Sequence, residues 1–239
     1  MTMSRPRRFL QQYFYFFMAL LVATVVVYGF SQTIDHNLIH PNPLPPFILN
    51  LHAIAFSGWV VFFILQSTLV RTRKVRIHRT LGWFGVALAV AMLVLGTGTA
   101  VSMDRFNVAQ MPREADFAAA FLIVQWGYLW VFGVLFALAI YWRRAPEFHR
   151  RLMLKATCVL TDAAFGRFPQ HMMGFSPFGA VGVTALVLLG VVRDLIVDRR
   201  VHKVYLYGIP ALLVCEAIFE YTFAHASPWW MHIARAVLY

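Results

Sequence analysis

Charged residues are scarce in this sequence. They make up only 13% of its 239 residues, whereas 60% are hydrophobic. Soluble globular domains carry about 25% charged and about 45–50% apolar residues. The shortage of charge therefore excludes a water-soluble protein, and it predicts an all-α membrane protein whose apolar segments cross the bilayer as helices.

Cysteines and catalytic motifs are also scarce. The two cysteines, Cys158 and Cys215, fall within apolar segments and have neither metal-finger spacing nor an extracellular disulfide pattern. The sequence lacks a Gly-rich phosphate-binding loop, a dinucleotide fingerprint, a nucleophile elbow and a His-Glu-x-x-His pair. It also lacks a Cys-x-x-Cys-His haem attachment site. These absences exclude ATPases and soluble-type hydrolases and imply that any haem is non-covalent, while the question of enzymatic activity stays open.

Seven apolar segments approach or exceed the length of about 20 residues that a bilayer crossing requires. They cover residues 12–34, 46–70, 80–103, 117–142, 152–174, 178–197 and 204–225. The connections between them are too short to form a water-soluble domain, so we expect a single transmembrane domain over residues 1–239. The first segment is not followed by a signal-peptide cleavage pattern, and we interpret it as a retained helix.

A short interfacial helix is expected at about residues 228–238. Ser227 and Pro228 suit the N-cap and the first helical position. Trp229, Trp230 and Tyr239 suit the boundary between lipid and water.

Basic residues collect on alternate connections of the predicted bundle. Seventeen of the 21 Lys and Arg lie on one side and three on the other. The positive-inside rule then places the N-terminus in the cytoplasm and the C-terminus outside, in the cell (inner) membrane. The net charge of +11 is thus a topology signal that gives no support to nucleic-acid binding, although it favours contact with anionic lipids at the cytoplasmic face.

Ionisable residues inside the predicted spans gather in the outer half of the bundle. Such residues are costly in hydrocarbon and usually serve a function. They are His52 in the second segment, Asp162, Arg167 and His171 in the fifth, and Glu216, Glu220 and His225 in the seventh. The loop residues Asp35, His36, His40 and Asp116 are expected just above them.

The spacing of these residues allows a buried charge network. Glu216 and Glu220 are four residues apart, as are Arg167 and His171, so each pair shares a helix face. Together with Asp162, they can neutralise one another as ion pairs.

A metal or haem site is the alternative. His52, His171 and one of the two glutamates would bind a transition metal, with His225 as a further candidate ligand. Two of the histidines could instead bind the iron of haem b from opposite sides.

The second segment carries a stripe of residues on one helix face. His52, Phe56, Trp59, Phe63 and Gln66 follow helical spacing, with three aromatic rings between two polar ends. Such a stripe either lines a flat cofactor such as haem or a quinone, with His52, Trp59 and Gln66 among its contacts, or packs in the core. In both cases the stripe places His52 inside the bundle.

Three further histidines mark the cytoplasmic starts of helices. His78, His149 and His202 are each followed by Arg or Lys. Three imidazoles at one level are a possible metal set, whereas basic flanks favour anchoring at the lipid headgroups.

The segments 51–59 (LHAIAFSGW), 78–83 (HRTLGW) and 149–154 (HRRLML), together with Gln66, resemble a widespread group of uncharacterised bacterial seven-helix integral membrane proteins. This resemblance implies the fold and no particular activity. A membrane His on one helix, followed by His-Arg-x-x-Gly at the start of the next, resembles more loosely the cytochrome b561-like and haem-copper oxidase assembly membrane proteins. This looser resemblance implies haem.

Two main functional hypotheses follow. The first is a redox or assembly protein that holds a metal or haem in an outer-leaflet polar pocket. The second is a small-molecule or proton-coupled transporter that uses the buried acids and Arg167, favoured by Pro169 and Pro210, which interrupt two helices. A structural subunit of a larger membrane complex is a third possibility.

Overall fold

The computed structural model describes residues 5–169 and 178–239, and helices are the only regular secondary structure in these ranges. Six of the helices are long and apolar enough to cross a membrane. They are α1 (Arg5–Ser31), α2 (Ile48–Arg71), α3 (Val75–Gln110), α4 (Ala115–Tyr141), α8 (Phe178–Val197) and α9 (Lys203–Ala224). This number of apolar helices indicates a multi-pass membrane protein.

The fifth apolar segment differs from the expected single helix over 152–174. It forms α5 (Pro146–Val159) and a short α6 (Asp162–Phe165), and residues 170–174 lie outside the described ranges. The helix is interrupted at Thr161, whose backbone N–H and hydroxyl both donate to the carbonyl of Cys158, at 2.9 and 2.6 Å. A hydroxyl that competes for a backbone carbonyl in this way loosens an α-helix.

The other boundaries are close to the expected ones, with two exceptions: α1 begins at Arg5 instead of residue 12, and α3 extends beyond both of its expected ends. This helix continues to Gln110, so most of the connection predicted after residue 103 is helical. The rest of the connection is a 3₁₀ turn, Pro112–Glu114. Between α1 and α2 lies a short π-helical turn, Asp35–Ile39.

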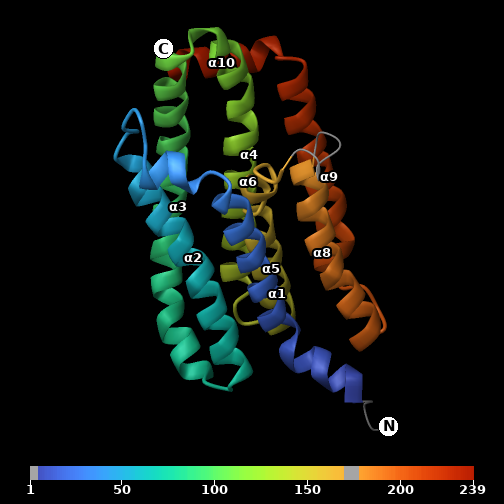
Figure 1. Cartoon of the computed structure of the whole chain (residues 1–239). Helices are drawn as coiled ribbons and strands as arrows, with labels where there is room; N and C mark the ends of the chain where they lie inside the picture. The colour runs from blue at the N-terminus through green and yellow to red at the C-terminus, as the bar shows by residue number, and fades with distance from the viewer. Residues whose placement is uncertain (1–4, 170–177) are drawn as a thin grey trace.

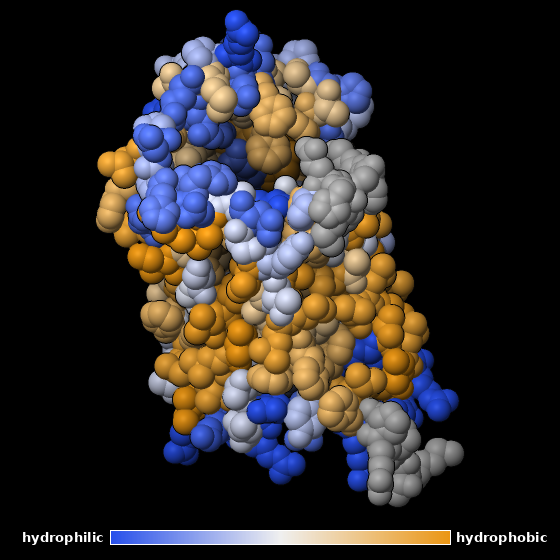
Figure 2. Space-filling view, viewed as in Figure 1, coloured by the Kyte–Doolittle hydropathy of each residue, from blue (hydrophilic) through white to orange (hydrophobic). Residues whose placement is uncertain are grey.

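Helices adjacent in sequence pack side by side, and the bundle has two distinct ends (Figure 1). One end holds the α2–α3, α4–α5 and α8–α9 turns, and we call it the basic end because most Lys and Arg lie there. The other end holds the α3–α4 connection and α10 (Pro228–Leu238). Figure 2 shows hydrophobic residues around the middle of the molecule and hydrophilic residues toward both ends.

The core runs through the bundle and takes side chains from most helices. Among the most buried are Val22, Trp59, Met92, Phe132, Leu154, Val183 and Tyr205. Gly29 allows α1 to approach α6 closely, since a side chain there would overlap the backbone of Ala164.

Helix α10 lies across the end of the bundle, against α3 and α4 (Figure 1). Its start matches the expected Ser227 N-cap and Pro228. Trp230 is buried and donates from Nε1 to the carbonyl of Ala119 at 3.0 Å, whereas Trp229 and Tyr239 are exposed. The helix is therefore docked on the protein by one face and leaves the other face free.

Candidate functional site

Three carboxyl groups and one phenol form a polar cluster in the half of the bundle away from the basic end. We call it the acid cluster; it consists of Tyr128 on α4, Asp162 on α6, and Glu216 and Glu220 on α9. The phenol of Tyr128 interacts electrostatically with all three carboxyl groups. Glu216 also interacts with Asp162 and Glu220.

The position of each acid follows from local sequence. Glu216 and Glu220 are one helical turn apart and face the same way from α9. Asp162 is the first residue of α6, directly after the break at Thr161. Its Oδ1 occupies the space that a side chain at Gly179 would need, so this glycine lets α6 and α8 approach each other.

Hydrogen-bond partners in the acid cluster are few. Glu216 is 4% exposed, and its Oε2 accepts a hydrogen bond from the hydroxyl of Thr184 at 3.3 Å. Among the residues that the structure describes, Glu216 Oε1 and the Tyr128 hydroxyl have no hydrogen-bond partner. Buried polar atoms are normally satisfied, so these two groups are available to a bound ligand or proton.

Arg167 does not pair with the glutamates. Its guanidinium lies over the ring of Phe30, 4.4 Å from the ring centroid, and donates to the carbonyl of Ala163. Because α6 ends at Phe165, Arg167 falls in the following turn and contacts α1 instead of facing α9. The expected ion pairs with Glu216 and Glu220 are therefore absent, and Arg167 acts on Asp162 only at longer range.

No ion pair within 4.0 Å joins any members of the predicted network Asp162, Arg167, Glu216 and Glu220, all of which are described. Within the described ranges, one other cation approaches the acids. Lys155 of α5 is buried, interacts electrostatically with Glu216, and donates from Nζ to the carbonyl of Gly208 on α9.

The histidines of this half do not assemble a metal site in the described ranges. His52 is half-buried and stacks on Phe56 with ring centroids 4.0 Å apart, and its Nδ1 has no partner there. His225 is exposed, and its Nδ1 lies 2.9 Å from the carbonyl of Tyr221. His171 lies outside the described residues. Across residues 5–169 and 178–239, no three His, Cys, Asp or Glu side chains are grouped so that they could hold a metal ion.

The aromatic stripe of α2 faces inward, but its residues nearer to the basic end, from Trp59 to Gln66, belong to the packed core. Trp59 is buried and packs edge-to-face on Phe132 and Phe136 at centroid distances of 5.2 and 5.6 Å. Gln66 is also buried, and its Oε1 lies 2.6 Å from Nδ1 of His78. Trp59 and Gln66 thus pack against protein, whereas His52 keeps a buried Nδ1 without a partner in the described ranges.

The three histidines at the basic end hold helix ends in place. The rings of His78 and His149 are 6.2 Å apart, and Nδ1 of His149 lies 2.9 Å from the carbonyl of Ala139. His202 caps α9, because its Nδ1 accepts a hydrogen bond from the N–H of Val204 at 3.2 Å. Burial and, next, the charge of Arg151 lower the pKa of His202 below its usual 6.5.

A buried ion-pair network at the basic end was not expected from the sequence. Arg151, only 1% exposed, donates to Asp194 from Nη2 and Nε at 2.6 and 2.9 Å, and to Asp198 at 2.8 Å. Arg193 also donates to Asp194 and Asp198, at 2.9 and 2.5 Å. The network thereby ties α5 to α8.

Glu147 completes this network from the first turn of α5. Its Oε2 accepts a hydrogen bond from Nη1 of Arg151 at 2.5 Å. The i, i+4 spacing of Glu147 and Arg151 in the sequence could have indicated this ion pair. The sequence prediction used these arginines only to assign the orientation of the helices.

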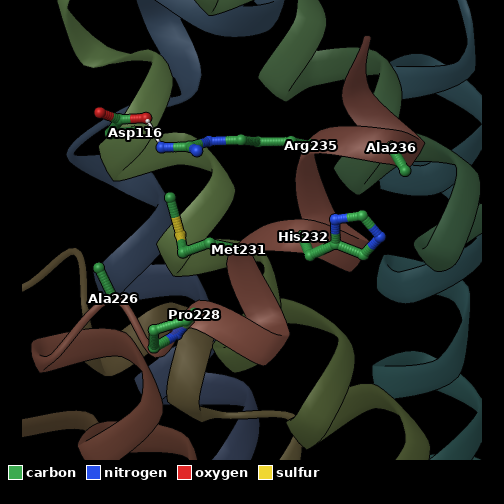
Figure 3. A pocket seen from close by; sticks show the side chains of 7 residues that line it. All are labelled: Asp116, Ala226, Pro228, Met231, His232, Arg235 and Ala236. Atoms are coloured by element: carbon green, nitrogen blue, oxygen red, sulfur yellow. Dashed lines mark hydrogen bonds and ion pairs between the residues drawn. The ribbon is translucent and has the colours of Figure 1, made fainter.

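Beyond the acid cluster, His40 pairs with Asp35, and Asp116 at the start of α4 pairs with Arg235 of α10. Nδ1 of His40 lies 2.8 Å from Oδ1 of Asp35. Asp116 accepts from Arg235 at 2.8 Å beside a cavity of about 550 Å³ against α10. Figure 3 shows Arg235 reaching to Asp116, while the imidazole of His232 is turned away from that pair. His36 lies in the same short helical turn as Asp35.

The surface is hollowed in this half of the molecule, near the C-terminal end of α1 (Figure 2).

Comparison with protein families, curated proteins and solved structures gives no match to the chain.

Proposed function

We propose that the protein is a seven-pass transporter of the inner membrane, with its basic end and N-terminus in the cytoplasm and its C-terminus outside. The Lys and Arg distribution supports this orientation. The α5–α6 segment would provide the seventh crossing, since its 20 residues from Pro146 to Phe165 span about 30 Å at 1.5 Å per residue.

The proposed activity is proton-coupled transport of a small cationic solute through the acid cluster. The observation that carries it is the proximity of a buried Glu216 to the half-buried Asp162 and Glu220, with no ion-pair partner for these carboxyl groups among the described residues. Three negative charges in a low-dielectric interior repel one another, so binding a proton or a cation relieves a large electrostatic cost.

The helices around the cluster support a translocation site. The helix formed by α5 and α6 breaks directly before Asp162, and Pro210 removes a backbone hydrogen bond in α9, the helix that carries both glutamates. Interrupted helices recur at the substrate sites of secondary transporters, where their free backbone groups face the ligand. The surface hollow lies in the same half of the bundle and is the proposed route from outside.

The redox or assembly alternative has weaker support from the described residues. His52 has a buried Nδ1 without a partner, but Trp59 and Gln66 pack against protein and His225 is exposed. A metal or haem would therefore need ligands beyond this set.

The proposal is tested with purified protein in liposomes that carry a pH gradient. Small quaternary amines, which cannot cross the lipid as neutral bases, are added one at a time, and at least one is expected to dissipate the gradient faster than in protein-free liposomes. Glu216→Gln and Glu220→Gln should each reduce that rate at least tenfold, whereas Asp116→Asn, which changes an exposed carboxyl group, should retain it. A panel of amines without effect, or full activity in both glutamine variants, would refute the proposal.

A further inference from the structure

A long apolar groove lies between α1 and α8, in the half of the bundle nearer to the basic end. It encloses about 370 Å³ and is lined by Phe14, Phe17 and Leu21 of α1 and by Leu189, Val192 and Arg193 of α8, with further apolar side chains. Along α1 the lining extends from Leu10 to Leu21, which is about 16 Å at 1.5 Å per residue. That length is about half of the 30 Å hydrocarbon core, so the groove is as deep as one leaflet.

Among the described residues that line the groove, Arg193 is the one that is charged, and its hydrogen bonding is incomplete. The side chain is 1% exposed, and only Nη1 takes part in the ion pairs with Asp194 and Asp198. Its Nε and Nη2 have no partner among the described residues. Leaving two donors of a buried guanidinium unsatisfied is costly, so an acceptor is expected beside them.

Two neighbouring residues, Arg7 and Tyr15, also have a buried polar atom without a hydrogen-bond partner among the described residues. Arg7 donates from Nη2 to the carbonyl of Val197, the last residue of α8, but its buried Nε has no partner in the described chain. The Tyr15 hydroxyl is also buried without a partner, and the Arg193 guanidinium lies 6.0 Å from the Tyr15 ring centroid. Free donors therefore gather where the apolar groove meets the basic end.

From this geometry we infer a binding site for one anionic phospholipid. An acyl chain fills the groove, and the phosphate accepts hydrogen bonds from Arg193 and Arg7. A polar solute does not suit the lining, which is apolar except for Arg193, while an uncharged lipid tail leaves the arginine donors unsatisfied. A ligand that joins one acyl chain to one phosphate suits both the apolar lining and the arginine donors, because guanidinium groups bind phosphate with charge-assisted hydrogen bonds.

Native mass spectrometry of the full-length protein in detergent tests this site. Phosphatidylglycerol is expected to bind at one saturable site at least tenfold more tightly than phosphatidylcholine with the same acyl chains. Inorganic phosphate should neither bind there nor compete. Equal affinity for the two lipids, or competition by inorganic phosphate, would contradict the assignment to an anionic phospholipid.

Two pairs of variants locate the site. Leu189→Trp fills the groove and should weaken phosphatidylglycerol binding at least tenfold, whereas Leu188→Trp, at the adjacent exposed position outside the groove lining, should not. Arg7→Gln should weaken binding severalfold, and Arg8→Gln, at an exposed neighbouring position, serves as its control. These changes leave the Arg193 ion pairs intact, and unchanged binding in both Leu189→Trp and Arg7→Gln would overturn the inference.

Discussion

Arg151 and Glu216 are both almost fully buried, yet their surroundings differ. Arg151 is surrounded by the carboxylates of Glu147, Asp194 and Asp198 at 2.5 to 2.8 Å. Glu216 has one weak hydrogen bond, from Thr184, and an Oε1 atom without a partner in the described chain. The first arrangement stabilises the packing of α5 on α8, whereas the second leaves a group free to bind and release a ligand.

The His202 cap predicts a pH-dependent stability. Because the pKa of His202 is lowered in the folded protein, the unfolded chain takes up a proton first as the pH falls below about 6.5. The stabilisation is thus fully present above that pH and decreases as the solution is acidified. His202→Asn keeps a capping side chain but removes this titration.

Thermal unfolding in detergent between about pH 7 and about pH 5 measures this effect. We expect the melting temperature of the His202→Asn variant to fall less over this range than that of the unchanged protein. His225→Asn, at an exposed histidine that caps the other end of α9, should behave like the unchanged protein. Parallel pH profiles for all three proteins would show that the His202 cap makes no such contribution.

At the level of helices, the close contact between α1 and α6 is tightly constrained. A Cβ atom at Gly29 would overlap the backbone of Ala164, which cannot move as a flexible side chain can. Gly29→Ala should therefore destabilise the protein by about 1–3 kcal/mol, the usual cost of overpacking. It should also displace α6 and reduce transport.

The matched control for this change is Gly58→Ala. Gly58 is in α2 and has open space around it, so the same substitution there should be neutral or slightly stabilising, through better helix propensity. The melting temperatures of the two variants in detergent make the comparison. Equal melting temperatures would mean that the α1–α6 contact is looser than the structure shows.

The sequence was sufficient to predict most helix boundaries, because continuous apolar runs and turns rich in Arg or Pro mark them directly. It was not sufficient to predict the break at Thr161, since this depends on one hydroxyl that competes for the Cys158 carbonyl. Because α6 ends early, Arg167 lies beside Phe30 and does not form the expected ion pair with Glu216. The ion-pair network around Arg151 was not predicted from the sequence, because the positive-inside rule treats every basic residue as a charge at the membrane surface.

At the scale of the whole molecule, the proposed orientation connects the two ends to different roles. The basic end has the buried ion-pair network and the proposed lipid site, both suited to a fixed anchor in the inner leaflet. The other half has the acid cluster and the surface hollow. Proposed transport requires the half with the acid cluster to move against the half anchored at the basic end.

Reporter fusions test this orientation in cells. Alkaline phosphatase, which is active only outside the cytoplasm, should be active when fused after Arg113 or Tyr239. It should be inactive when fused after Arg73 or Arg144. The opposite pattern would invert the bundle and direct the acid cluster toward the cytoplasm.

The most direct measurement of the central claim is the protonation of the acid cluster itself. Infrared difference spectra of the purified protein in lipid, recorded between acidic and alkaline buffer, detect carboxyl groups that gain or lose a proton. We predict a buried-carboxyl band that disappears in Glu216→Gln and persists in Asp116→Asn. An identical band in all three proteins, or no titrating buried carboxyl group, would contradict the account.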